Sequence, residues 1–79
     1  MPVIFRANGL RFVIFTDDHA PPHVHGLGHG EVRIGIEGDC PVLTNKGLSR
    51  ADVVKARNAV KGLQSELLKA WEEIHGGTD

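Results

Sequence analysis

The sequence predicts an α+β fold in which a small antiparallel sheet of four to five strands packs against one long C-terminal helix. Two observations predict this class. The first half of the chain consists of short β-branched and aromatic runs separated by turn residues, and residues 49–75 repeat apolar side chains at helical spacing. Because 79 residues leave room for one hydrophobic core, residues 1–79 are expected to form a single domain.

Residues 3–16 are predicted to form a β-hairpin. Two runs rich in Val, Ile, Leu and Phe flank the dipeptide Asn8-Gly9. Both residues of such a pair accept the positive φ angles that a tight two-residue turn requires. The chain is therefore expected to reverse direction at Asn8-Gly9.

Residues 31–44 are predicted to add further strands to the sheet. Residues 31–37 alternate between apolar and polar side chains, which is typical of an antiparallel strand with one buried face. Residues 41–44 begin with a proline, which suits a strand at the edge of a sheet.

Residues 49–75 are predicted to form the helix. Ser49 is a favourable N-cap, and Asp52 is spaced for a return contact of the capping-box kind. Gly62 lies in the middle of this segment, where glycine destabilises a helix by about 1 kcal/mol relative to alanine. The sequence leaves open whether the helix bends at this residue. The apolar stripe that would face the sheet has seven members: Val53, Ala56, Val60, Leu63, Leu67, Ala70 and Ile74.

Composition and charge narrow the classes of function. The net charge is −1, whereas nucleic-acid-binding domains are usually basic, so nucleic acid is not indicated as a partner. No run approaches the roughly 20 apolar residues that cross a bilayer, and the N-terminal residues do not resemble a signal peptide. Cys40 is the one cysteine and is expected to be a small buried apolar residue. The chain is expected to be cytoplasmic, without a membrane association.

The segment of residues 17–30 holds four of the five histidines. His23 and His25 are two residues apart, so on a strand their side chains project from the same face. With His19 they are the predicted ligands of a zinc or nickel ion, and Asp17 or Asp18 is close enough to add a carboxylate. His29 lies among glycines and is the weakest candidate ligand of the four.

Two other roles for this segment stay open. As a catalytic site, the candidate residues are Asp18, His19, His23 and His25, with Asp18 orienting His19. No persuasive nucleophile accompanies them, but cleavage of RNA needs only a base, an acid and a cation such as Arg11 or Arg33. As a structural segment, its histidines would hydrogen-bond to the backbone. The sequence leaves open whether the chain is an enzyme.

The helix carries its basic residues in its first half and its acidic residues in its second, which opposes the preference of the helix dipole. Two explanations of this charge arrangement stay open. The charged residues either form a solvent-exposed face of the helix, or the basic ones bind phosphate or an acidic partner. The candidate binding residues are Arg50, Arg57, Lys61 and Lys46.

Residues 18–25, Asp-His-Ala-Pro-Pro-His-Val-His, resemble a small bacterial family known as domain of unknown function 4160, with its DHxPPHVHV-like signature. The resemblance extends over nearly the whole chain. Gly26 departs from it, because family members usually continue the strand with an apolar or charged residue, and this puts the length of the strand in doubt.

The resemblance implies no established catalytic residues. It implies that the chain is encoded beside another small protein, in a pair that looks like a toxin–antitoxin or regulatory module. The leading hypothesis is therefore a cytoplasmic partner-binding protein of such a pair. The alternative is a small ribonuclease or metal-binding protein that uses His19, His23 and His25.

Overall fold

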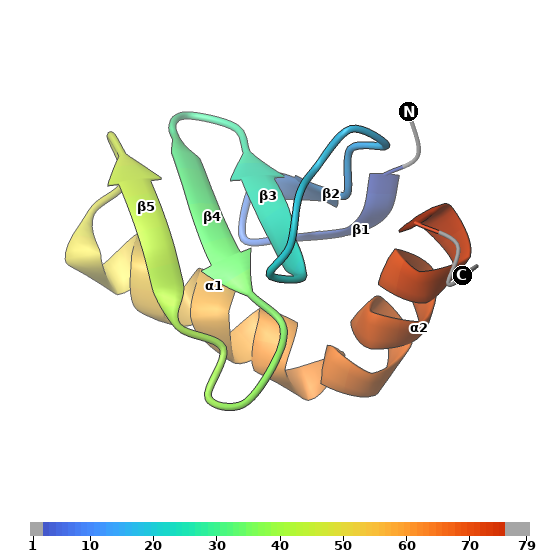
Figure 1. Ribbon diagram of the computed structural model, residues 1–79. Coiled ribbons are helices and arrows are strands. Elements are labelled where there is room, and N and C mark those ends of the chain that lie inside the picture. The colour runs from blue at the N-terminus through green and yellow to red at the C-terminus, as the bar shows by residue number, and fades with distance from the viewer. Residues whose placement is uncertain (1–2, 76–79) are drawn as a thin grey trace.

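The computed structural model describes residues 3–75 as one antiparallel sheet with two helices against one of its faces (Figure 1). The sheet has five strands that neighbour one another in chain order. The strands are β1 (Val3–Ala7), β2 (Leu10–Val13), β3 (His23–Leu27), β4 (Glu31–Gly35) and β5 (Val42–Lys46). The helices are α1 (Arg50–Gly62) and α2 (Gln64–His75). The predicted α+β class, an antiparallel sheet with C-terminal helical cover, is confirmed.

The turn between β1 and β2 has the conformation that its sequence favours. Asn8 has a φ of 56° and Gly9 a φ of 79°. β3 lies within residues 17–30, the His/Pro segment. It includes Gly26 and runs to Leu27, so the departure from the family pattern does not shorten it. A side chain at residue 26 would lie 3.0 Å from both the Phe12 ring and Val32, which explains why glycine fits there.

The helical segment is interrupted once. Leu63 separates α1 from α2, with a φ of −116° and a ψ of 21°, directly after Gly62. The change of direction lets α1 run behind β4 and β5 while α2 turns toward the β1 side of the sheet (Figure 1). Within residues 3–75, neither helix is long and apolar enough to cross a membrane.

The hydrophobic core lies between the sheet and the helices. Strand residues of alternating position, such as Val24, Val32 and Ile34, meet the helix residues Val60 and Leu67, and all five are fully buried. In the core, the Phe12 ring stacks on Phe5 with a centroid distance of 4.4 Å. Since successive strand residues alternate in face, this core leaves the side chains at 23 and 25 on the opposite side of β3.

Polar side chains of the helices hold the turn before β5. The Arg57 guanidinium donates from Nε to the carbonyl of Cys40 at 3.0 Å and from Nη2 to that of Asp39 at 2.6 Å. Gln64 donates to the carbonyl of Ile36 at 3.0 Å. Cys40 is fully buried, as expected, and burial raises the pKa of its thiol. These contacts fix the helices against the sheet.

Candidate metal centre

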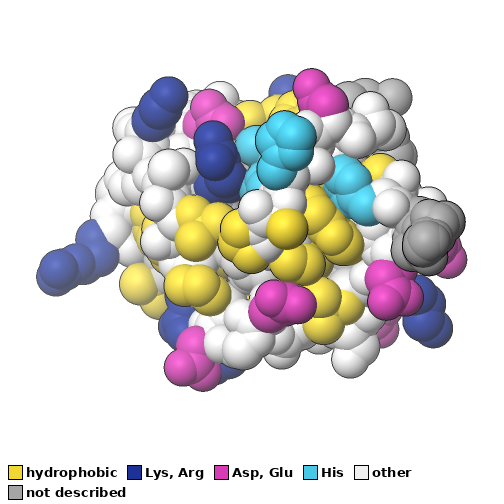
Figure 2. All heavy atoms as spheres, viewed as in Figure 1, with side chains coloured by type: hydrophobic (Ala, Val, Ile, Leu, Met, Phe, Trp, Pro, Cys, Tyr) yellow, Lys and Arg dark blue, Asp and Glu magenta, His cyan; other side chains and the backbone are white. Residues whose placement is uncertain are grey.

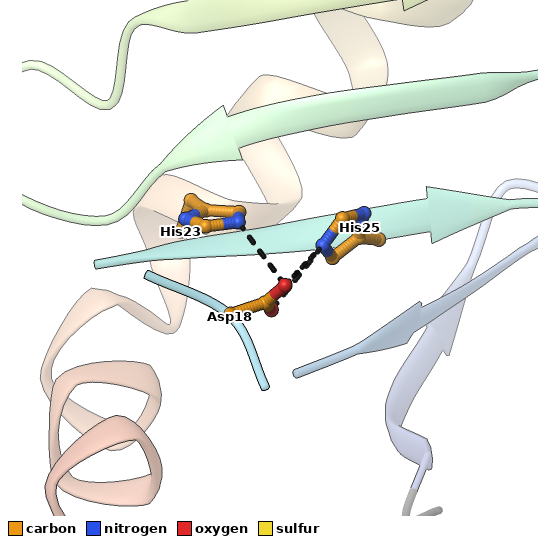
Figure 3. Close-up of side chains that lie close together, drawn as sticks. All are labelled: Asp18, His23 and His25. Carbon is orange, nitrogen blue, oxygen red and sulfur yellow. Dashed lines mark hydrogen bonds and ion pairs between the residues drawn. The ribbon is translucent and has the colours of Figure 1, made fainter. Parts of the chain in front are cut away.

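Three side chains of the His/Pro segment converge on the face of the sheet opposite the hydrophobic core. His23 and His25 project from β3, and Asp18 reaches them from the loop between β2 and β3 (Figure 3). One ligand atom from each of the three lies within 4.8 Å of the others. On the same face, Figure 2 shows histidine side chains with a basic side chain beside them and hydrophobic side chains below.

The loop holds Asp18 in place through its own hydrogen bonds. The Phe15 N–H donates to Asp18 Oδ2 at 3.0 Å, and the Asp18 N–H donates to the Phe15 carbonyl at 3.2 Å. The Phe15 ring also packs edge-on against His25 at a centroid distance of 4.6 Å. The Asp18 carboxylate is therefore positioned by its turn with Phe15, and the Phe15 ring packs on His25, the residue that the carboxylate faces.

The two rings present the same nitrogen, Nε2, to Asp18. His25 Nε2 lies 3.1 Å from Oδ1 and 3.2 Å from Oδ2, and His23 Nε2 lies 3.6 Å from Oδ1. Ligand atoms around a tetrahedral ion with bonds of about 2.0–2.1 Å are separated by roughly 3.3 Å. The nitrogen–oxygen separations of 3.1 and 3.6 Å lie on either side of that value, and one ligand atom from each of the three residues lies within 4.8 Å of the others. The three side chains are therefore close enough together to be ligands of one ion.

The second nitrogen of each ring, Nδ1, has an oxygen next to it. His23 Nδ1 lies 2.7 Å from the carbonyl of Pro21, which only accepts, so this nitrogen carries the proton. In the neutral ring, Nε2 is then a lone pair aimed at Asp18. His25 Nδ1 lies 3.5 Å from Glu31 Oε2 and makes no hydrogen bond within the described residues. Metal-binding histidines characteristically have a carbonyl or carboxylate at the other nitrogen.

The site is largely shielded from solvent. His23 is 5% exposed and His25 7%. Burial raises the pKa of the Asp18 carboxyl. The hydrogen bonds from His25 and from the Phe15 N–H, together with the charges of His25 and His23, outweigh burial and hold that pKa below its ordinary value of 3.8. Asp18 therefore stays ionised and faces the two rings as a carboxylate.

His19, predicted as a ligand, has a different place from the other two histidines. It is exposed and lines the mouth of the same cavity, but it is outside the group of converging ligand atoms, in which Asp18 stands as the third member. Its role as a ligand or a catalytic group stays a prediction. Asp17 also lines the cavity and is exposed.

His29 belongs to a separate contact. Its Nε2 lies 3.0 Å from Asp52 Oδ2, which ties the β3–β4 turn to the first turn of α1. Ser49 caps that helix as expected, accepting from the Asp52 N–H at 3.1 Å, while the Asp52 carboxylate faces His29.

The hydrogen bond from His29 is the main cause of a lowered pKa at Asp52, whose ordinary value is 3.8. We expect His29→Ala to move this pKa back up toward 3.8, as followed by NMR titration of the carboxyl carbon. A lowered pKa stabilises the folded state above pH 3.8, and that contribution is lost as the pH falls through the folded value. His19→Ala is the control, since His19 does not contact Asp52. An unchanged Asp52 titration in His29→Ala would contradict the assignment.

The predicted basic binding residues do not form one free cluster. Arg57 uses its guanidinium on the two carbonyls before β5, so it has a structural role. Lys46 at the end of β5, Arg50 at the start of α1 and Lys61 near its end are all exposed. Their role in binding stays a prediction.

Four residues that neighbour the site come from other strands or from a helix, and the histidine motif itself does not point to them. Arg33 and Leu43 line the cavity from β4 and β5, and Glu31 faces His25. The Trp71 ring of α2 lies 5.5 Å from that of His23. The alternation of residues 31–37 was a usable signal for Glu31 and Arg33, because it places both on the face opposite the core. Nothing local in the sequence indicates that Trp71 reaches β3.

Comparison with known proteins supports one assignment. No curated protein and no solved structure matches the chain. One family model matches residues 9–72, which include the whole converging site, and it is described as a domain of unknown function, DUF4160. The chain therefore belongs to the DUF4160 family, as the signature around Asp18 and His25 suggests.

Proposed function

We propose that the protein binds a divalent transition-metal ion, zinc or nickel, through Asp18 Oδ1, His23 Nε2 and His25 Nε2. The observation that carries the proposal is that one ligand atom from each of the three residues lies within 4.8 Å of the others. Nitrogen and carboxylate ligands suit both metals. Three protein ligands with a cavity beside them are typical of zinc sites that keep one position open for water or a substrate.

The hydrogen bond between His23 and the Pro21 carbonyl supports the same proposal. In a neutral His23 ring with its proton on Nδ1, Nε2 and the Asp18 carboxylate present lone pairs to each other at 3.6 Å. A cation between them turns this repulsion into attraction. In the competing explanation a proton, instead of a metal ion, lies between His23 Nε2 and the carboxylate, and the imidazoles are ion-pair partners of Asp18. The two explanations differ in whether metal binds.

The test is a titration of the protein with Zn²⁺ and Ni²⁺, followed by the histidine ring signals in NMR and by calorimetry. We expect one equivalent to bind, with the rings of His23 and His25 shifted and that of His29 unchanged. Asp18→Asn should weaken binding by about a hundredfold or more, because even outer partners of a ligand contribute ten- to a hundredfold. The asparagine oxygen can still accept the Phe15 N–H, so the loop is expected to keep its fold.

Asp17→Asn is the matched control, because it removes the neighbouring exposed carboxylate and should leave the affinity unchanged. Trp71, the one tryptophan, provides a second readout. Its ring lies 5.5 Å from His23, so Ni²⁺ at the site should quench its fluorescence. Absence of ring shifts at His23 and His25, or equal affinity in Asp18→Asn and wild type, would overturn the proposal.

RNA cleavage, the reaction considered from the sequence, uses the same side chains. If it occurs, the zinc-loaded wild type should cleave a short RNA and His23→Ala should not. Cleavage by both proteins, or by neither, would remove the ribonuclease hypothesis.

Partner binding is the second candidate, and β5 favours it. This strand ends the sheet, all five of its residues are exposed, and Val42 and Leu43 are 38% and 40% exposed. An exposed edge strand with apolar side chains accepts a strand from another chain. We propose that the partner is the small protein encoded beside this one, as in a toxin–antitoxin-like pair.

Co-expression of the two proteins tests this candidate. We expect a complex with wild type that is lost in Val42→Lys, since a charge on an edge strand opposes pairing. Val54→Lys, on an exposed site of α1, is the control. A missing complex with wild type, or an equally stable complex with Val42→Lys, would refute it.

A further inference from the structure

The cavity beside the proposed metal centre has a cationic wall that the metal proposal does not use. The cavity measures about 320 Å³ and opens to solvent beside His19. Arg33 lines it from β4, directly across from His25 in the β3–β4 register, so the two side chains share a face. Arg33 is exposed, and within the described part of the chain no carboxylate lies within ion-pair distance of it.

The charges around the cavity favour an anion. A divalent ion held by one carboxylate and two neutral imidazoles keeps a net charge of about +1, and the Arg33 guanidinium adds a positive charge that offsets the exposed Asp17 carboxylate on the same cavity. The guanidinium presents its donors as a planar fork, which matches two oxygens of a carboxylate or phosphate group. The metal offers an open position to a further oxygen.

The remaining walls indicate what the anion is attached to. Ala20, Pro21 and Leu43 line the cavity with apolar surface, and the volume exceeds what a single small anion fills. A phosphate ester meets these conditions, since its oxygens reach both cations while its organic part lies on the apolar wall. A phosphate group also has more oxygens than a carboxylate and can contact the metal and the guanidinium at the same time.

We propose that the metal-loaded site binds the phosphate group of a phosphate ester, with one oxygen on the metal and others on the Arg33 guanidinium. This inference rests on the proposed metal binding by Asp18, His23 and His25. In this proposal Arg33 binds and orients the phosphate group. The metal alone would bind water at its open position.

The experiment uses protein loaded with one equivalent of Co²⁺, whose unpaired electrons broaden the ³¹P signal of any phosphate near it. The probes are inorganic phosphate and a nucleoside monophosphate, with acetate as a competitor. We expect both probes to be broadened, the ester to bind more tightly than inorganic phosphate, and acetate to compete weakly. Arg33→Met should weaken phosphate binding by about ten- to a hundredfold, the range for charged hydrogen bonds. Arg6→Met, an exposed arginine of β1, should have no effect.

The two proposals fail in different ways. If Co²⁺ does not bind, the metal proposal fails and this inference fails with it. If Co²⁺ binds and neither probe is broadened, or Arg33→Met binds phosphate as wild type does, the metal proposal stands and this inference is overturned. If inorganic phosphate binds as tightly as the ester, the role of the apolar wall is refuted.

Discussion

Phe12→Ala is expected to lower the free energy of unfolding by about 3–5 kcal/mol, the range for truncating a buried aromatic side chain. Phe12 is fully buried and stacks on Phe5 at 4.4 Å. It also fills the space over Gly26, which has no side chain of its own to occupy the cavity. A domain of 79 residues has a total stability of roughly 4–12 kcal/mol. The variant should therefore lose a large fraction of its stability, and it would be mostly unfolded at 25 °C if the wild type lies at the lower end of that range.

Urea denaturation followed by circular dichroism measures this loss. Phe12→Leu is the control, because leucine retains part of the buried volume and should lose considerably less stability. A loss below about 1 kcal/mol in Phe12→Ala would show that Phe12 does not anchor the core.

A pair of glycine substitutions should change stability in opposite directions. At Gly30, an added Cβ would lie 2.7 Å from the backbone oxygen of Lys46 and 3.0 Å from the carbonyl carbon of Gly47. Backbone cannot move aside as a side chain can, so Gly30→Ala should destabilise the protein by about 1–3 kcal/mol. At Gly62, the last residue of α1, an added Cβ meets nothing within 4 Å. Gly62→Ala should stabilise the protein by up to about 1 kcal/mol.

Both variants replace glycine with alanine, so the difference between their two midpoints of denaturation reports the effect of the local packing around each residue. If both variants shift in the same direction, the close approach of the β3–β4 turn to the connection before α1 is not as described. That connection leads from β5 to the helix N-terminus, so the result also tests how the helix is joined to the sheet.

Much of the fold was predictable because its signals are local. Asn8-Gly9 fixes a turn, residues 31–37 show a strand alternation, and Ser49 starts a helix, each through contacts a few residues long. Gly62 left a bend open, but the sequence did not determine that the helix is interrupted at Leu63, since the apolar stripe continues through it without a gap. Packing against the sheet and the hydrogen bonds from Gln64 are long-range effects that decide where the helix turns.

The candidate site was predictable in part for the same reason. His23 and His25 share a face by the period of a strand, which the sequence shows directly. Which residue joins them depends on the path of the loop. Asp18 is positioned by its turn with Phe15, whereas His19, next to it in the chain, is exposed and lines the cavity outside the group of converging ligand atoms. The alternation of residues 31–37 indicates the face on which Arg33 lies, but its place beside His25 depends on the β3–β4 register, and Trp71 reaches the site through helix packing that no short motif records.

The three proposed ligands lie within eight consecutive residues, from Asp18 to His25. A metal that binds them also binds the unfolded chain to some extent, because bringing such close residues together closes only a short loop. Affinity for the denatured state subtracts from the stabilisation that binding gives the native state. The thermal shift on adding Zn²⁺ should therefore be smaller than the affinity of the folded protein alone implies, and a peptide spanning residues 15–27 should retain measurable affinity.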